Sequence, residues 1–330
     1  MRIQPIMIPD RPGDPSDDDL VTSLHAAYLA GYHEDAGPAL PLARFRRDVC
    51  THSPAQRMEA WVLLDDDRVI GGYALRFPQL DNRHMGSVFP LVVDPAYRGR
   101  GLGSALFEHA VERMRAQGRK LLLTETLTTG VGARFARTHG MSVGLAEARR
   151  TLDLRQADWD ALERMIPAVE GYTLERWIGP ATPELLPDLV TLLNGMNDAP
   201  RQGDLEDMTF SVDGVRAREE SLPAVGRTCY TTIARRDSDG APAGYTRVFL
   251  DAGPSAVWGE QADTAVLRGH RGHRLGLLLK LANLLWLREQ EPHLERIITW
   301  NATSNGHMLA INEAMGFELF DEWNQWQLSL

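Results

Sequence analysis

The fold of this chain is decided by the stretch Val88-Phe89-Pro90-Leu91-Val92-Val93-Asp94-Pro95-Ala96-Tyr97-Arg98-Gly99-Arg100-Gly101-Leu102-Gly103. Its apolar start is typical of a strand, its Gly/Arg centre predicts a tight loop, and the apolar spacing that follows predicts a helix over 102–117. Glycines let the backbone turn sharply and approach a ligand closely. Free N–H groups at the start of a helix attract anions. We therefore expect a phosphate or pyrophosphate group at this loop, with Arg98 and Arg100 adding positive charge.

Two common phosphate-binding motifs are excluded. The loop lacks the third glycine of the G-x-G-x-x-G dinucleotide pattern and the Gly-Lys-Ser/Thr of the P-loop. Arg98-x-x-Gly101-x-Gly103 resembles the acetyl-CoA loop of the GNAT acyltransferase superfamily, whose pattern is Arg/Gln-x-x-Gly-x-Gly/Ala. The resemblance implies an α/β fold with a mixed sheet that splays apart after its fourth strand, so that CoA enters the gap.

Length and composition limit the class of protein. A chain of 330 residues, 43% hydrophobic and 24% charged, is expected to form about two globular domains. It has no run of eighteen apolar residues, no signal-peptide core and only two cysteines, Cys50 and Cys229, so we expect no membrane span, disulfide framework or metal site. The net charge of −10 argues against nucleic-acid binding. We expect a cytoplasmic monomer or homodimer.

The strand–loop–helix pattern occurs twice. A second Gly/Arg loop, His270-Arg271-Gly272-His273-Arg274-Leu275-Gly276, aligns with the first without a gap, and it also lies between an apolar strand and an apolar helix. An internal repeat of this length predicts two copies of one fold. We place the domains at 1–155 and 156–330. The second half also resembles actinobacterial tandem GNAT proteins through its loop and through Thr299-Trp300-Asn301-Ala302-x-x-Asn305-x-x-Met308-x-x-x-Asn312.

The family resemblance assigns candidate catalytic positions. GNAT proteins commonly take a general base about eleven residues before the loop Arg/Gln, which is Glu260 in the second half and Ser87 in the first. Only the second half thus offers a carboxylate, and the alternative is that Glu260 is a solvated residue at a strand end. The usual acid, a tyrosine four residues before a Gly-Phe pair, is replaced by Asn312. In the first half the matching residue is Ala136.

The resemblance also assigns cofactor contacts to the end of each strand and to each loop. In the second loop Arg274 replaces Gly101, and its side chain would either crowd the pyrophosphate or lean outward. Asn301 and Asn305 match positions that hold the pantetheine amides, although Asn305 is also explained as a helix-start residue. The complete expected set comprises Leu91, Val92, Val93, Arg98, Gly99, Arg100, Gly101, Leu102, Gly103, Ser104, Ala265, Val266, Leu267, Arg271, Gly272, His273, Arg274, Leu275, Gly276, Asn301 and Asn305.

The function implied by the resemblance is transfer of an acetyl group from acetyl-CoA to the primary amine of a small molecule. We expect the chemistry in the C-terminal domain, where Glu260 lies. Two alternatives stay open. Because the usual tyrosines are missing, the chain is also read as a non-catalytic acyl-CoA-binding or sensing protein. The tandem layout is also similar to that of mycothiol synthase, whose acceptor is a cysteinyl amine.

Overall fold

The computed structural model describes residues 1–9, 17–32, 37–199, 205–253 and 256–330, and these form two compact units. Unit 1 comprises residues 1–144, 204–206 and 324–330, and unit 2 comprises 145–203 and 207–323. The units thus exchange short segments. A single boundary at residue 155 does not describe this exchange, and the division into folding domains stays a prediction.

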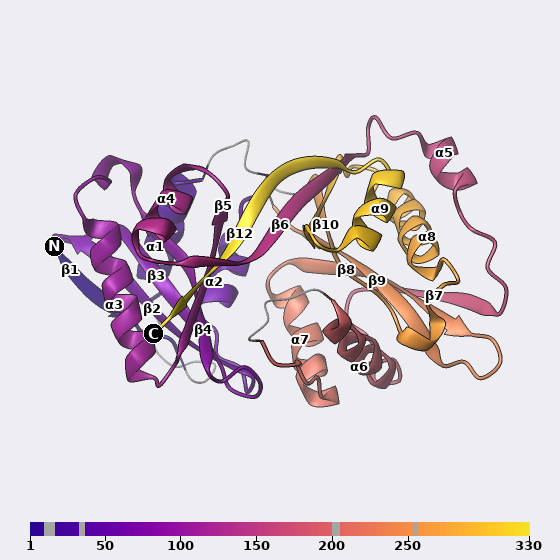
Figure 1. The fold of residues 1–330 in the computed structure, drawn as a ribbon, viewed down its shortest axis with the longest axis horizontal. Coiled ribbons are helices and arrows are strands. Elements are labelled where there is room, and N and C mark those ends of the chain that lie inside the picture. The colour runs from indigo at the N-terminus through magenta and orange to yellow at the C-terminus, as the bar shows by residue number, and fades with distance from the viewer. Residues whose placement is uncertain (10–16, 33–36, 200–204, 254–255) are drawn as a thin grey trace. The chain divides into compact units, whose positions relative to one another are not determined.

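Unit 1 is a mixed sheet with helices on both faces (Figure 1). Its strand order is β1-β2-β3-β4-β5, followed by the end of β12. Helices α1 and α2 pack against one face through Leu24, Phe45 and Val49, and α3 and α4 pack against the other through Leu106 and Ala133. The elements are β1 (Arg2–Ile6), α1 (Asp18–Ala30), α2 (Leu42–Cys50), β2 (Gln56–Asp65), β3 (Arg68–Pro78), β4 (Met85–Val93), α3 (Leu102–Ala116), β5 (Leu121–Leu127), α4 (Gly130–Thr138) and the start of β6 (Ser142–Asp153).

Unit 2 repeats this plan with the strand order β6-β11-β10-β9-β8-β7. Helices α6 and α7 cover the sheet face that carries Ile233 and Tyr245, whereas α8 covers the face that carries Tyr230 and Val248 (Figure 1). Residues alternate between the faces because successive side chains of a strand point in opposite directions. The elements are α5 (Trp159–Arg164), β7 (Tyr172–Ile178), α6 (Leu186–Asn194), α7 (Val212–Ala224), β8 (Arg227–Arg236), β9 (Pro242–Asp251), β10 (Trp258–Val266), α8 (Leu275–Gln290), β11 (Arg296–Ala302), α9 (Gly306–Ala314) and β12 (Glu318–Ser329).

The predicted repeat of strand, loop, helix, strand and helix is confirmed in both units, with small differences at the ends of elements. Sequence analysis did not predict β1, α7 or β12 as elements. No helix in the parts of the chain described here is long and apolar enough to cross a membrane.

The end of the chain completes the core of unit 1. Trp326 is 2% exposed and packs in the cluster beneath α3 and α4. Its Nε1–H donates to Thr126 Oγ1 at 2.7 Å, and the Arg137 guanidinium lies 5.4 Å from the centre of the ring. A residue near the C-terminus therefore contributes to the stability of the first unit.

Replacing Trp326 tests this contribution. We expect Trp326→Ala to lower the free energy of unfolding of unit 1 by about 3 to 5 kcal/mol, because a large buried side chain leaves a cavity and Thr126 loses its partner. Urea unfolding followed by circular dichroism measures the change. Leu319→Ala, on the same strand but 57% exposed, is the control and should change little. Equal effects of the two variants would contradict the assignment of Trp326 to this core.

A lysine is buried in the core of unit 2. Lys280, on α8, is 1% exposed and lies with its ammonium 5.3 Å from the centre of the Phe317 ring. Burial penalises the charged form and lowers the pKa of this ammonium to about 7. The unfolded chain thus binds the proton more tightly than the folded chain. Stability therefore rises with pH between about 7 and 10.5, and the full cost applies below pH 7.

We expect Lys280→Met to stabilise unit 2, because methionine has a similar length and no charge to bury. The fall in pKa corresponds to a gain on the order of 5 kcal/mol below pH 7 and to a much smaller gain at pH 9.5. Urea midpoints at pH 6.5 and pH 9.5 measure it. The only other lysine, Lys120, is exposed, so Lys120→Met is the control. A loss of stability in Lys280→Met at pH 6.5 would contradict the prediction.

Candidate functional site

Each unit has a parallel strand pair that opens into a gap. In unit 1, β4 and β5 pair at Met85–Leu121, Gly86–Leu122 and Ser87–Leu123, and this register includes no later residue of either strand. In unit 2, β10 and β11 pair over four residues and stop at Gln261–Thr299. The second half of each strand therefore has an edge that its parallel neighbour does not cover. The splayed sheet implied by the family resemblance is present in both units.

A strand irregularity lies where each gap opens. The register of β3 and β4 shifts between Leu75–Val88 and Tyr73–Leu91, and that of β9 and β10 shifts between Val248–Gln261 and Thr246–Thr264. An extra residue in one strand bends it and interrupts the regular hydrogen bonding. The bend therefore directs β4 and β10 away from their parallel neighbours at matching positions.

The first Gly/Arg loop joins β4 to α3 through a backbone that only glycine adopts easily. Gly99 and Gly101 have φ of 76° and 77°, and a Cβ built on either meets no atom within 4 Å. The N–H groups of Leu102, Gly103 and Ser104 open α3 and therefore have no acceptor within the helix. The loop thus offers a row of amides beside open space, which is the geometry of an anion cradle.

The second loop keeps this shape with a different residue. Gly272 has φ of 86°, and Arg274, at the position of Gly101, also has a left-handed φ of 59°. The residues that open α8 are Leu275, Gly276 and Leu277. Arg274 is exposed. The backbone course of the loop is therefore the same in both units, and the orientation of the Arg274 side chain relative to a bound pyrophosphate stays a prediction.

The first arginine of each loop braces the loop through its Nε–H. Arg98 donates to Val93 O at 3.0 Å, and Arg271 donates to Val266 O at 3.0 Å. Arg271 Nη2 also contacts Asp198 Oδ2 at 2.7 Å. These contacts hold the loop against the end of its strand, which sequence analysis had not indicated. Arg100 is exposed and lies 5.2 Å from the centre of the Tyr97 ring.

The loop histidines of unit 2 contact a tyrosine of β7. Tyr172 Oη lies 2.9 Å from Nδ1 of His270, and the rings of Tyr172 and His273 are 5.8 Å apart. Both histidines thus connect the second Gly/Arg loop to β7 through Tyr172. The remaining expected cofactor positions lie on the strands that lead into the loops. Leu91, Val92 and Val93 follow the irregularity in β4, and Ala265, Val266 and Leu267 end or follow β10.

Glu260 lies at the mouth of the gap in unit 2. It pairs with Ile298 one residue before the pairing of β10 and β11 ends, and its side chain is 30% exposed. Arg227 Nη2 contacts Glu260 Oε2 at 2.5 Å. The Glu260 carboxylate thus forms an ion pair with a guanidinium that is 8% exposed, and its assignment as a general base stays a prediction.

Arg227 is held on several sides, and sequence analysis missed it. Its Nε lies 3.5 Å from Asp251 Oδ1, and its guanidinium stacks 4.3 Å from the centre of the Phe249 ring. Arg227 and Asp251 are directly opposite each other at the ends of β8 and β9. Opposite charges at matching ends of a predicted hairpin were the signal that could have indicated this pair.

Of the three asparagines expected at the site, two hydrogen-bond to each other and the third caps a helix. Asn312 is fully buried and its Nδ2 donates to Asn301 Oδ1 at 2.7 Å, so the structure brings these two together at the splayed part of β11. The Oδ1 atom of Asn312 is buried without a hydrogen-bond partner among the described residues. Asn305 caps α9 by accepting from the N–H of Met308 at 3.3 Å. Its interpretation as a helix-start residue is confirmed.

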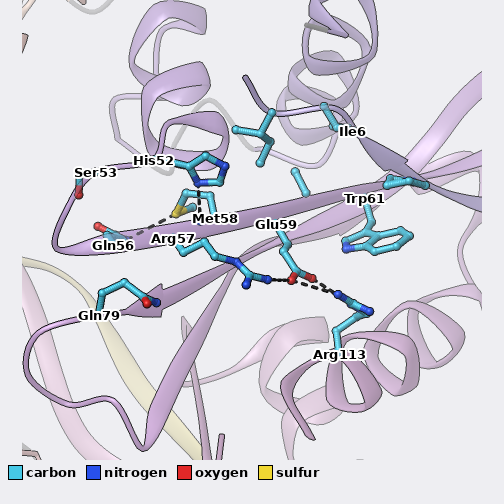
Figure 2. Close-up of a pocket in the computed structure, with 13 residues that line it drawn as sticks. Ile6, His52, Ser53, Gln56, Arg57, Met58, Glu59, Trp61, Gln79 and Arg113 are labelled. Atoms are coloured by element: carbon cyan, nitrogen blue, oxygen red, sulfur yellow. Dashed lines mark hydrogen bonds and ion pairs between the residues drawn. The ribbon is translucent and has the colours of Figure 1, made fainter. Parts of the chain in front are cut away.

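A hollow of about 570 Å³ with apolar and charged lining residues lies elsewhere in unit 1, beside the end of β1 and along β2 (Figure 2). In it Glu59 is held between Arg57 and Arg113 (Figure 2). Arg113 Nε donates to Glu59 Oε2 at 2.9 Å, and Gln117 also donates to this carboxylate. None of the residues that line the hollow belongs to the Gly/Arg loop or to β4. The hollow is therefore separate from the candidate cofactor site.

Comparison with known proteins agrees with this architecture. The acetyltransferase (GNAT) family matches residues 21–141. A tandem GNAT protein from the clavulanic acid biosynthesis pathway, solved without AcCoA, is 29% identical, with a TM-score of 0.79 over 99% of this chain and 98% of that one. A search of curated proteins finds no match.

More distant structures share the fold alone. A GCN5-related N-acetyltransferase from Sphaerobacter thermophilus is 17% identical, with a TM-score of 0.62 over 98% of this chain and 97% of that one. A putative acetyltransferase from Pyrococcus horikoshii is 12% identical, with a TM-score of 0.58 over all of this chain and 89% of that one. Residues 21–141 thus match the acetyltransferase (GNAT) family, and the whole chain, with its duplicated splayed sheet and two Gly/Arg loops, has the architecture of a tandem GNAT protein.

Proposed function

We propose that this protein transfers an acetyl group from acetyl-CoA to the primary amine of a small molecule, and that unit 2 carries the chemistry. The observation that carries the proposal is the position of Glu260, one residue before β10 and β11 separate. The gap that opens there leads along β10 to the amides at the start of α8. A carboxylate at one end of this path and an anion cradle at the other fit an acyl thioester that carries a phosphorylated tail.

The residues of unit 2 fit CoA in two respects. The N–H groups at the start of α8 suit a pyrophosphate, because they have no acceptor in the helix and carry the positive end of its dipole. The separated edge of β10 suits the amides of an extended pantetheine arm, because backbone groups there do not pair with β11. Bound in this way, acetyl-CoA would supply an acetyl thioester at the mouth of the gap.

Glu260 is assigned as the general base for the acceptor. A carboxylate can accept about four hydrogen bonds, so its ion pair with Arg227 is compatible with accepting a proton from an ammonium. Transfer forms a bond from the amine nitrogen to the acyl carbon and breaks the bond from that carbon to sulfur. Glu260 accepts one proton from the ammonium before attack, and the second proton, which the nitrogen loses as the amide forms, passes to solvent. Asn312 orients the thioester arm through its buried oxygen, and solvent supplies the proton to the leaving sulfur.

The test is a measurement of CoA release with a panel of primary amines that includes amino sugars and a cysteinyl amine. We expect Glu260→Gln to lower kcat/KM at least 100-fold, because general base catalysis contributes factors of this size. Glutamine keeps an oxygen that can accept from Arg227, so the local fold should persist.

Asp263→Asn is the matched control, since it removes a second carboxylate from the same irregular part of β10. It should leave kcat/KM within a few fold of the original. An unchanged rate in Glu260→Gln would remove Glu260 as the base. Absence of CoA release with every amine, together with CoA binding, would favour the non-catalytic acyl-CoA-binding alternative.

The two cradles can be tested separately by charge reversal at matching loop positions. Arg100→Glu and His273→Glu each place a carboxylate beside the amides of one loop, on an exposed side chain. We expect two sites for CoA in isothermal titration calorimetry and a loss of at least tenfold in affinity at one site in each variant, because like charges repel. The unchanged loop is the internal control. Unaltered binding in both variants would contradict the phosphate-cradle assignment.

A further inference from the structure

The two units carry different side chains where their parallel strands separate, although their Gly/Arg loops align in sequence without an insertion. Where unit 2 has Ala262 and Asp263, the matching residues of unit 1 are Phe89 and Pro90. Where unit 2 has Glu260, unit 1 has Ser87, at the last pair of β4 with β5. The same backbone irregularity thus presents a carboxylate and a small side chain in one unit and an aromatic side chain in the other.

Phe89 belongs to a group of aromatic residues that continues onto α1 and α2. We call Tyr28, Tyr32, Phe45 and Phe89 the aromatic ladder. The Phe89 ring meets the Tyr28 ring edge-on at 6.2 Å, and Tyr28 lies 5.4 Å from Phe45 and 5.5 Å from Tyr32. Phe45 is fully buried, so the ladder is anchored in the core on the α1 face of the sheet.

The outer end of the ladder remains open to solvent. Phe89 is 43% exposed and lies on the strand that leads into the first Gly/Arg loop. Val92, three residues further along β4, packs against the same cluster. An apolar ligand group that covered Phe89 would therefore join a surface continuous with the core, and its burial would be favourable in proportion to the area covered.

Phe89, at the open end of the aromatic ladder, lies on the strand that leads directly into the first Gly/Arg loop. Val93 lies four residues after Phe89, which corresponds to about 13 Å along β4, and the first Gly/Arg loop follows directly. A CoA molecule with its pyrophosphate on the amides of α3 and its arm along the open edge of β4 would thus bring its acyl group to Phe89. This step rests on the phosphate-cradle assignment made for the proposed function.

We propose that unit 1 is a binding site for acyl-CoA molecules whose acyl group is apolar and larger than acetyl, and that it binds them without transferring the group. The aromatic ladder recognises the acyl chain. Ser87 supplies no carboxylate at the position that Glu260 occupies in unit 2, so the matching site has no base for an acceptor amine. In unit 2, Ala262 packs against the cluster of Leu222, Cys229 and Phe249 and offers no comparable aromatic surface.

The test is isothermal titration calorimetry of the full chain with CoA, acetyl-CoA, butyryl-CoA and hexanoyl-CoA, in the His273→Glu background that weakens the second loop. We expect affinity to rise about two- to fourfold for each added methylene, because each buried methylene contributes about 0.8 kcal/mol when fully covered. Phe89→Ala should abolish this rise and leave the affinity for CoA and acetyl-CoA unchanged. Phe89→Leu should restore part of it.

Leu80→Ala is the matched control, because Leu80 is an exposed apolar residue of the same unit at 58% exposure, outside β4 and the ladder. It should leave the dependence on chain length intact. Equal affinity for all four ligands would overturn the acyl-chain assignment while leaving the cradle assignment standing. Absence of any CoA binding to unit 1 would overturn both. Neither result bears on Glu260→Gln, whose readout is the rate of transfer.

Discussion

The termination of hydrogen bonding between two parallel strands is the constraint on which the candidate site depends. Backbone groups inside a sheet are normally paired, and an unpaired buried group costs free energy. Both units nevertheless stop pairing after three or four residue pairs, at an irregularity in the strand that precedes the Gly/Arg loop. The open edge that results can pair with an extended molecule, much as a sheet edge pairs with an added strand.

Comparison of the two units shows which features of the backbone they share and which side chains differ between them. Arg274 adopts the left-handed conformation that Gly101 adopts, although this conformation is unfavourable for a residue with a Cβ. The second loop thus has the same backbone shape as the first, although an arginine replaces the glycine. At the mouth of the gap the opposite holds, because Glu260 and Ser87 occupy matching backbone positions with different chemistry. The geometry of the loop is common to both units, and the side chains where the parallel strands separate are particular to each.

Sequence analysis predicted the features whose signal is local. Both Gly/Arg loops, their helices and the hairpins were evident from glycine positions and apolar spacing. Helix α7 was missed because few of its residues are buried, and one of these is Glu219, which is 1% exposed. This charge is compatible with the core because Arg247 of β9 meets it at 2.8 Å and the N–H of Ala181 donates to it at 3.2 Å. The exchange of residues 324–330 was missed because alternation in a strand does not identify the sheet that it joins.

The same non-local contacts determine the environment of Glu260. Arg227, which pairs with Glu260, stacks 4.3 Å from the Phe249 ring, and Arg247 lies 4.8 Å from the same ring. Arg247 in turn pairs with Glu219 of α7. Glu260 was predicted from its spacing to a loop, but its ion-pair partner Arg227 shares the Phe249 ring with Arg247, which pairs with a helix that the sequence pattern did not indicate. Position along the chain can identify a candidate base, but the side chains that orient it come from strands and a helix brought together only by the fold.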